Sequence, residues 1–181
     1  MRALVINRTK YFVLSWKDVE RDVAKLAEQI FPKPTAIVGI LKGGIIVARL
    51  LSDFLGVEKI RFLGLRYYKE IEKRKKGVEI YQPLTESLRG EDVLLVDDVA
   101  DTGKSIEVGR QAIIILKPKS LKIATLYIKP HLKKKPDYFV RCLDGWIIYP
   151  WEKFESVRGI LGKVSNKYTK KEIDKIIKKF E

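Results

Sequence analysis

The clearest chemical signal in this sequence lies in residues 93–105, which read VLLVDDVADTGKS. An apolar run with the pattern of a buried strand ends in two adjacent acids, Asp97 and Asp98, and Asp101 follows in the turn. Paired carboxylates at the end of a strand suit the hydroxyl groups of a sugar, or a hard cation held beside phosphates. The stretch therefore predicts a site for a sugar or for a hard cation beside phosphates.

The residues that follow the acids have the composition of a phosphate-binding turn. Thr102 and Ser105 offer hydroxyl groups, and the first backbone N–H groups of a helix expected at 104–116 have no partners within that helix. Gly103 lets the backbone approach an anion closely. The turn is therefore predicted to bind the phosphate.

Two other interpretations of the stretch are weaker. Residues 103–105, GKS, resemble the end of a Walker A loop, but Asp98 stands where that motif needs its first glycine. A P-loop NTPase is therefore not predicted. The purely structural alternative is an acid-tipped strand and a capped helix without a ligand. That alternative gives no role to Asp97, Asp98 and Asp101, three acids within five residues.

Composition limits the remaining classes of function. The 181 residues include 37 Lys and Arg against 23 Asp and Glu, a formal net charge of +14. That excess either attracts nucleic acid, an anionic membrane or a multiply phosphorylated small molecule, or forms a solvated lysine-rich surface. A single cysteine, Cys142, and a single histidine, His131, exclude a disulfide framework and a conventional His/Cys metal cluster. Without a long apolar run or a signal-peptide pattern, a cytoplasmic protein is expected.

Strands that alternate with helices predict an α/β fold with a mostly parallel sheet and helices on both faces. Strands are expected at residues 11–14, 36–40, 59–65, 79–82, 92–97, 121–128, 138–142 and 146–149. Helices are expected at residues 15–30, 45–55 and 104–116 and from residue 169 to the end. Residues 69–78 are highly charged and predict a mobile loop or a hairpin arm. Ligands of such sheets bind at the carboxyl ends of strands, which directs attention to the turns after residues 40, 97 and 128.

The stretch 93–105 closely resembles the PRPP-binding motif of the type I phosphoribosyltransferases, which transfer a 5-phosphoribosyl group to nitrogenous bases. The resemblance extends over roughly residues 10–158. It implies the type I phosphoribosyltransferase fold, a central, mostly parallel sheet flanked by helices with a small hood. Residues 1–145 would form the core, with a flexible lid at about 67–78, and residues 146–181 the hood segment and a C-terminal helix.

The resemblance implies a PRPP site. Asp97 and Asp98 would hold the ribose hydroxyls. The 5′-phosphate would be bound by Ala100, Asp101, Thr102, Gly103, Lys104 and Ser105. Residues 39–44, GILKGG, look like the pyrophosphate loop, with Lys42 at the basic position before Gly43 and Gly44. In related enzymes the peptide bond before that basic residue can be cis.

The resemblance also assigns roles to Arg158, Tyr67 and Tyr68. Arg158 has the spacing of an arginine that reaches the pyrophosphate in hypoxanthine–guanine enzymes. Residues 66–68, RYY, resemble the start of the catalytic lid, and the sequence leaves open whether Tyr67 or Tyr68 is the lid tyrosine.

Residues 124–130, ATLYIKP, are similar to the 6-oxopurine enzymes of the family. There a lysine, here Lys129, donates to the purine 6-oxo group, and Asp101 would sit beside N7 as general acid and base. Trp146 matches the aromatic residue that stacks on the base, and Ile147 the residue whose backbone meets the base edge. Residues 149–152, YPWE, resemble the xanthine–guanine enzymes.

The YPWE stretch also bears on the metal. Glu152 stands where the xanthine–guanine enzymes carry an aspartate near metal or pyrophosphate. Asp98 and Glu152 are therefore the candidate metal ligands.

The implied activity is purine salvage by a Mg²⁺-dependent pentosyltransferase. PRPP and hypoxanthine, guanine or xanthine would give the nucleoside 5′-monophosphate and pyrophosphate. The expected assembly is a homodimer or higher homo-oligomer without a membrane or nucleic-acid partner. Two alternatives stay open: an adenine phosphoribosyltransferase on the same scaffold, and a PRPP-sensing regulator that binds nucleic acid through its basic surface. Asp101 and Lys129 favour an enzyme, because a sensor needs only the PRPP cradle.

Overall fold

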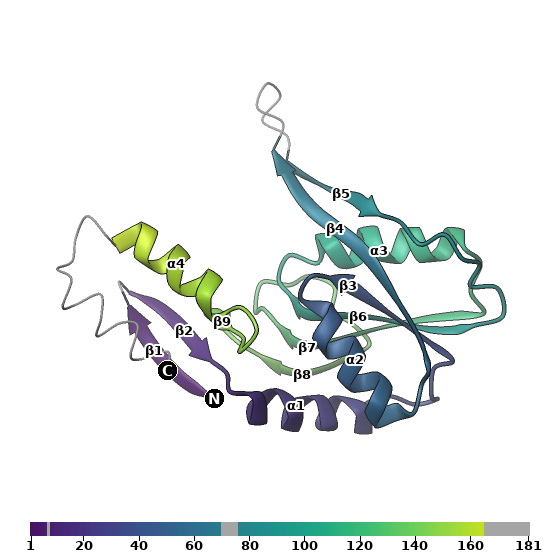
Figure 1. Ribbon diagram of the computed structural model, residues 1–181, viewed down its shortest axis with the longest axis horizontal. Helices are drawn as coiled ribbons and strands as arrows, with labels where there is room; N and C mark the ends of the chain where they lie inside the picture. The colour runs from purple at the N-terminus through teal and green to yellow at the C-terminus, as the bar shows by residue number, and fades with distance from the viewer. Residues whose placement is uncertain (7, 70–75, 165–181) are drawn as a thin grey trace. The chain divides into compact units, whose positions relative to one another are not determined.

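The computed structural model describes residues 1–6, 8–69 and 76–164, which form two compact units (Figure 1). The larger unit is Glu20–Leu143. The smaller unit combines Met1–Val19 with the described chain after residue 143. Residues 1–19, expected with the core, therefore group with the C-terminal segment, because an N-terminal strand pairs with a strand that follows residue 145.

The larger unit is built on a six-stranded sheet of order β5-β4-β3-β6-β7-β8. Its strands are β3 (Ala36–Leu41), β4 (Lys59–Lys69), β5 (Lys76–Gln82), β6 (Asp92–Ala100), β7 (Ser120–Ile128) and β8 (Tyr138–Cys142). Every pairing is parallel except that of β4 with β5. Strand β3 and residues 93–96 of β6 are continuous apolar runs, as expected of strands covered on both faces. The predicted α/β class is confirmed.

Helices cover both faces of this sheet. Helix α2 (Gly44–Leu55) packs on β3, β4 and β6, and α3 (Lys104–Ile115) packs on β4 to β7. Gly39 faces α2, because a Cβ atom there would lie 2.9 Å from the Cβ of Ala48. Its neighbours Val38 and Ile40 point the other way and belong to the apolar cluster that contains Ile113 of α3. Because β3, β6 and β7 pair in parallel, their carboxyl ends lie side by side at one end of the sheet.

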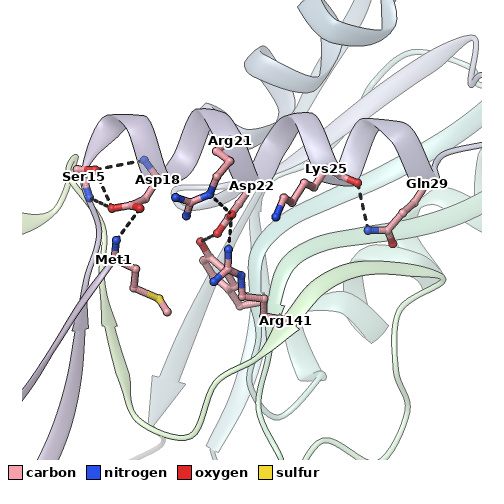
Figure 2. A network of polar contacts seen from close by, with 9 residues as sticks. Met1, Ser15, Asp18, Arg21, Asp22, Lys25, Gln29 and Arg141 are labelled. Atoms are coloured by element: carbon pink, nitrogen blue, oxygen red, sulfur yellow. Dashed lines mark hydrogen bonds and ion pairs between the residues drawn. The ribbon is translucent and has the colours of Figure 1, made fainter.

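Helix α1 (Trp16–Gln29) is fixed to the sheet by a buried carboxylate that the sequence analysis did not identify (Figure 2). The side chain of Asp22 is fully buried. It accepts hydrogen bonds of 2.7 Å from the Tyr127 hydroxyl of β7 and from Arg141 Nη2 of β8. Arg21 Nε lies 3.1 Å from the same carboxylate. A buried charge of this kind needs such partners, so the network ties α1 to two strands.

Ser15 and Asp18 cap the start of α1 reciprocally. The backbone N–H and the hydroxyl of Ser15 donate to Asp18 Oδ2 at 3.0 and 2.7 Å, and the Asp18 N–H donates back to Ser15 Oγ at 3.2 Å. The N-terminal ammonium of Met1 lies 2.5 Å from Asp18. Burial acts to raise the pKa of Asp18, but the hydrogen bonds from the ammonium and from Ser15 prevail and lower it.

The smaller unit contains a three-stranded sheet of β1 (Arg2–Ile6), β2 (Thr9–Val13) and β9 (Trp146–Ile148), together with α4 (Lys153–Val164). Its apolar cluster joins Tyr11, Val13, Ile148 and Ile160. Neither β1 nor α4 was predicted. Helix α4 contains Gly159, and glycine lowers helix propensity by about 1 kcal/mol relative to alanine, so packing must favour this helix.

Two predicted boundaries are corrected. Strand β6 continues beyond residue 97 to Ala100, because Val99 and Ala100 pair with β7, so the turn begins only at Asp101. Strand β4 continues to Lys69, and residues 67–69 pair with 76–78 of β5 in a hairpin arm.

Some expectations fall outside the described part of the chain. They concern residues 70–75 and the helix expected from residue 169, and closure of the lid stays a prediction. None of the described helices combines the length and apolar character needed to cross a bilayer. The cytoplasmic location stays a prediction.

Candidate active site

Two acids meet at the carboxyl end of β6. Asp98 is buried and Asp97 half-buried. The Asp98 N–H donates to Asp97 Oδ1 and the Val99 N–H to Asp98 Oδ1, both at 2.9 Å. Burial raises the pKa of the Asp97 carboxyl well above its usual range, and the charge of Asp98 raises it further. Burial also raises the pKa of Asp98. A cation or a set of hydroxyl donors would relieve this concentration of negative charge.

The loop between β3 and α2 lies against these acids. A Cβ atom at Gly43 would lie 2.4 Å from Asp98 Oδ1, and one at Gly44 would lie 2.5 Å from the Val96 carbonyl oxygen. Only glycine permits so close an approach. The preceding Leu41–Lys42 peptide bond is cis, as the resemblance implies, and the Lys42 side chain is exposed. The structure thus brings the expected pyrophosphate loop beside the expected ribose site.

The turn between β6 and α3 borders a cavity of about 510 Å³. It is lined by Tyr67, Asp97, Asp98, Val99, Ala100, Asp101, Thr102, Gly103, Lys104, Ser105 and Ile106. Gly103 has a φ of 78°, in the left-handed region that favours glycine, and α3 begins directly after it. The cavity therefore meets the first turn of α3, where backbone N–H groups lack partners within the helix.

The structure distinguishes the two tyrosines of β4. The hydroxyl of Ser105 donates to the Tyr67 hydroxyl at 3.0 Å, and Tyr67 lines the cavity. The ring of Tyr68 instead lies over Gly77 of β5, where a Cβ atom would come within 2.6 Å of it. Successive side chains of a strand point to opposite faces. Of the two candidates, only Tyr67 contacts the turn that is predicted to bind phosphate.

Lys129 follows β7 in a turn that is attached to the end of β6. Its backbone N–H donates to the Ala100 carbonyl at 3.0 Å, and the Leu132 N–H donates to the Lys129 carbonyl at 3.1 Å. Within this turn His131 Nε2 lies 2.7 Å from Asp101 Oδ1. The sequence alone does not indicate a role for His131. Its position two residues after Lys129 is the one feature of the sequence that suggests a place near the base-binding site.

The remaining candidates lie in the smaller unit. Trp146 begins β9 and is 59% exposed, whereas Ile147 is buried. Glu152 is half-buried in the turn after β9, and Arg158 is exposed on α4. Their roles toward base, metal and pyrophosphate stay predictions. Within residues 1–6, 8–69 and 76–164, no three His, Cys, Asp or Glu side chains could together hold a metal ion.

Comparison with known proteins identifies the family. The phosphoribosyl transferase domain family matches residues 13–157. A xanthine-guanine phosphoribosyltransferase of Idiomarina loihiensis is 30% identical over 150 residues, which cover 81% of this chain and 89% of the relative. The resemblance found in residues 93–105 is thereby confirmed.

Solved structures agree. A purine phosphoribosyltransferase from Pyrococcus horikoshii has a TM-score of 0.72 and 36% identity, covering 78% of this chain and 93% of that chain. A Neisseria gonorrhoeae protein with bound ppGpp has a TM-score of 0.72 and 29% identity, covering 80% and 90%. The chain therefore belongs to the phosphoribosyl transferase domain family and is a phosphoribosyltransferase.

Proposed function

We propose that this enzyme transfers the 5-phosphoribosyl group of PRPP to a 6-oxopurine, with release of a nucleoside 5′-monophosphate and pyrophosphate. The observation that carries the proposal is the attachment of the Lys129 turn to the end of β6 through the 3.0 Å hydrogen bond from Lys129 N–H to the Ala100 carbonyl. This bond supports the proposal because it joins the backbone of Lys129, the proposed base-binding lysine, to Ala100, one of the residues proposed to hold PRPP. The family relatives named as xanthine-guanine and purine enzymes support the same substrate class.

In this proposal PRPP lies along the end of the sheet. The turn at 102–105 and the first N–H groups of α3 bind the 5′-phosphate, as helix N-termini do for anions. Asp97 and Asp98 accept hydrogen bonds from the ribose hydroxyls. The pyrophosphate lies at the loop of Gly43 and Gly44, beside the positive charge of Lys42.

The acids also fit a magnesium ion. Mg²⁺ is usually held by one or two carboxylates together with phosphate oxygens of the substrate. Asp98 would hold it, and the role of Glu152 stays a prediction from the sequence. When bound, Mg²⁺ supplies positive charge that offsets the charge growing on the pyrophosphate. Burial raises the pKa of Asp98, so a nearby cation would favour its ionised form.

Asp101 accepts the proton that the purine releases during the reaction. The N9 lone pair forms the bond to C1′ while the bond from C1′ to the pyrophosphate oxygen breaks, and that oxygen keeps the electron pair. The purine proton passes from N7 to the Asp101 carboxylate, which acts as general base. Asp101 is 59% exposed in the absence of substrate, so a base can approach it. Lys129 donates to the 6-oxo group and disfavours the amino group of adenine.

A product assay tests this function. The protein is mixed with PRPP and Mg²⁺, each of hypoxanthine, guanine, xanthine and adenine is offered separately, and monophosphate is followed by chromatography. Product from a 6-oxopurine is expected. Product from adenine alone would keep the PRPP site and overturn the base pocket. Binding of PRPP without product from any base would favour the regulator. Light scattering of the same sample tests the expected homo-oligomer.

A further inference from the structure

The side chain of His131 is directed at the proposed general base. Its Nε2 lies 2.7 Å from Asp101 Oδ1, a short distance for a hydrogen bond between a ring nitrogen and a carboxylate. His131 is the only histidine of the chain. The contact joins two loops that are 30 residues apart in sequence, the turn after β6 and the turn after β7. Apart from Asp101, the contact includes no residue to which the proposed mechanism gives a role.

The turn that carries His131 is held in place from both ends. Lys129 N–H donates to the Ala100 carbonyl, and Leu132 N–H closes the turn on the Lys129 carbonyl. Leu132 is buried in an apolar cluster with Ala100 and Ile128. Because Ala100 immediately precedes Asp101, the anchors of the turn and the carboxylate belong to one local structure. The position of His131 is therefore set by backbone contacts and by apolar packing.

The chemistry of the two groups decides which of them donates. To act as general base Asp101 must be an ionised carboxylate, which only accepts, so this mechanism requires the hydrogen on Nε2 of His131 and donation to Oδ1. The other carboxylate oxygen, Oδ2, stays available for the purine. We infer that His131 is a positioning residue, which orients the Asp101 carboxylate for the N7 proton; this role rests on the proposed function above.

The same turn sets the spacing of two contacts to the base. The 6-oxo group and N7 lie on one edge of a purine, so their donor and acceptor must stand at a fixed separation. In the proposal Lys129 donates to the oxo group, and His131, two residues later, orients the Asp101 carboxylate that accepts the N7 proton. One turn thus aligns both contacts, and misalignment would reduce turnover more than PRPP binding.

The contact contributes little to folding. The side chains of His131 and Asp101 are 63% and 59% exposed, and pairs so open to solvent add little stability. Substitutions of His131 should therefore leave the protein folded. A loss of activity in such variants would reflect the orientation of Asp101 rather than loss of structure.

Kinetics provide the first test. His131→Ala should lower kcat by about tenfold, a part of the 10²–10⁴ that general acid–base catalysis contributes, with the KM for PRPP changed less than about twofold. His131→Gln should recover most of kcat, because its amide nitrogen donates from a similar position. In the Asp101→Asn background, His131→Ala should cause no further loss, since it acts through Asp101. Lys133→Ala, an exposed change in the same loop, is the matched control.

Spectroscopy provides a test that does not depend on activity. In tag-free, ¹⁵N-labelled protein the single histidine yields one set of imidazole signals. In mildly alkaline buffer we expect hydrogen on Nε2, and a shift of this tautomer balance in Asp101→Asn. A histidine with hydrogen on Nδ1, insensitive to Asp101→Asn, would overturn the inference.

The outcomes separate this role from the function on which it rests. A wild-type protein that makes no nucleotide would overturn the proposed function and the role of His131 together. Wild-type turnover with an unchanged kcat in His131→Ala would overturn the positioning role alone. Equal losses in His131→Ala and His131→Gln, or additive losses with Asp101→Asn, would also overturn it.

Discussion

A Cβ atom on Gly43 would lie 2.4 Å from Asp98 Oδ1, so the backbone that leads into α2 is in direct contact with the carboxylate at the end of β6. Two segments more than 50 residues apart thus form one wall of the proposed PRPP site. The contact requires glycine, because any larger residue must displace either the loop or the acid.

Gly43→Ala should therefore impair PRPP binding and turnover. A displacement of this wall should reduce kcat/KM for PRPP by at least about tenfold, because misplacement of about 1 Å can cost 10²-fold. Steady-state kinetics with PRPP as the varied substrate measure the effect. Gly159→Ala in α4 is the control, because its new methyl group would meet nothing within 4 Å. Unchanged kinetics of Gly43→Ala would argue against a tight wall at this place.

Tyr67→Phe should weaken the phosphate-binding turn. It removes the hydroxyl that accepts from Ser105 at 3.0 Å, and one hydrogen bond is worth about 0.5–1.5 kcal/mol. We expect a loss of about two- to tenfold in kcat/KM for PRPP. Tyr68→Phe should lose less, and Tyr81→Phe on β5 is the control. A larger effect of Tyr68→Phe would identify Tyr68 as the lid tyrosine.

Asp97→Asn should stabilise the protein while abolishing PRPP binding. Burial and the charge of Asp98 raise the pKa of Asp97, so above the ordinary carboxyl pKa the native state binds more protons than the unfolded state. The stability contributed by Asp97 is full below that ordinary pKa and is lost as pH rises through the raised value. Thermal unfolding as a function of pH should show a flatter decline for Asp97→Asn. Asp53→Asn, at a side chain that is 77% exposed, should leave the decline unchanged.

Lys129→Ala should affect the base far more than PRPP. A hydrogen bond from a charged donor contributes about 1.5–3 kcal/mol, so kcat/KM for guanine and hypoxanthine should fall by about 10- to 100-fold. The Kd for PRPP, measured by calorimetry, should change little. Lys133→Ala is the control in the same loop. Equal losses for base and PRPP would make Lys129 a structural residue.

Arg141→Met should destabilise the larger unit. It removes a cation that lies 2.7 Å from the fully buried Asp22, and breaking a buried pair costs about 3–5 kcal/mol. Arg141 is 32% exposed, so the lower end of that range is expected, a fall in Tm of roughly 6–12 °C. Arg49→Met, at an exposed ion pair, should change Tm much less. An equal change in both variants would show that solvent screens Asp22.

The sequence by itself determined the class of fold, and it predicted the chemistry at the end of β6. Both are local properties: apolar runs alternate with helical spacing, and acids, hydroxyls and a glycine all lie within residues 97–105. It did not predict β1 or α4. The two glycines at 159 and 162 disfavour a helix, and only packing against the small sheet favours one.

The tertiary structure decided which residues meet across the chain. It separated Tyr67 from Tyr68, because the pairing of β4 with β5 sets which face each side chain takes. It brought Gly43 against Asp98 and His131 against Asp101, and it surrounded Asp22 with partners from β7 and β8. Each of these contacts joins segments distant in sequence, and such a contact exists only once strand order and register have placed the segments side by side.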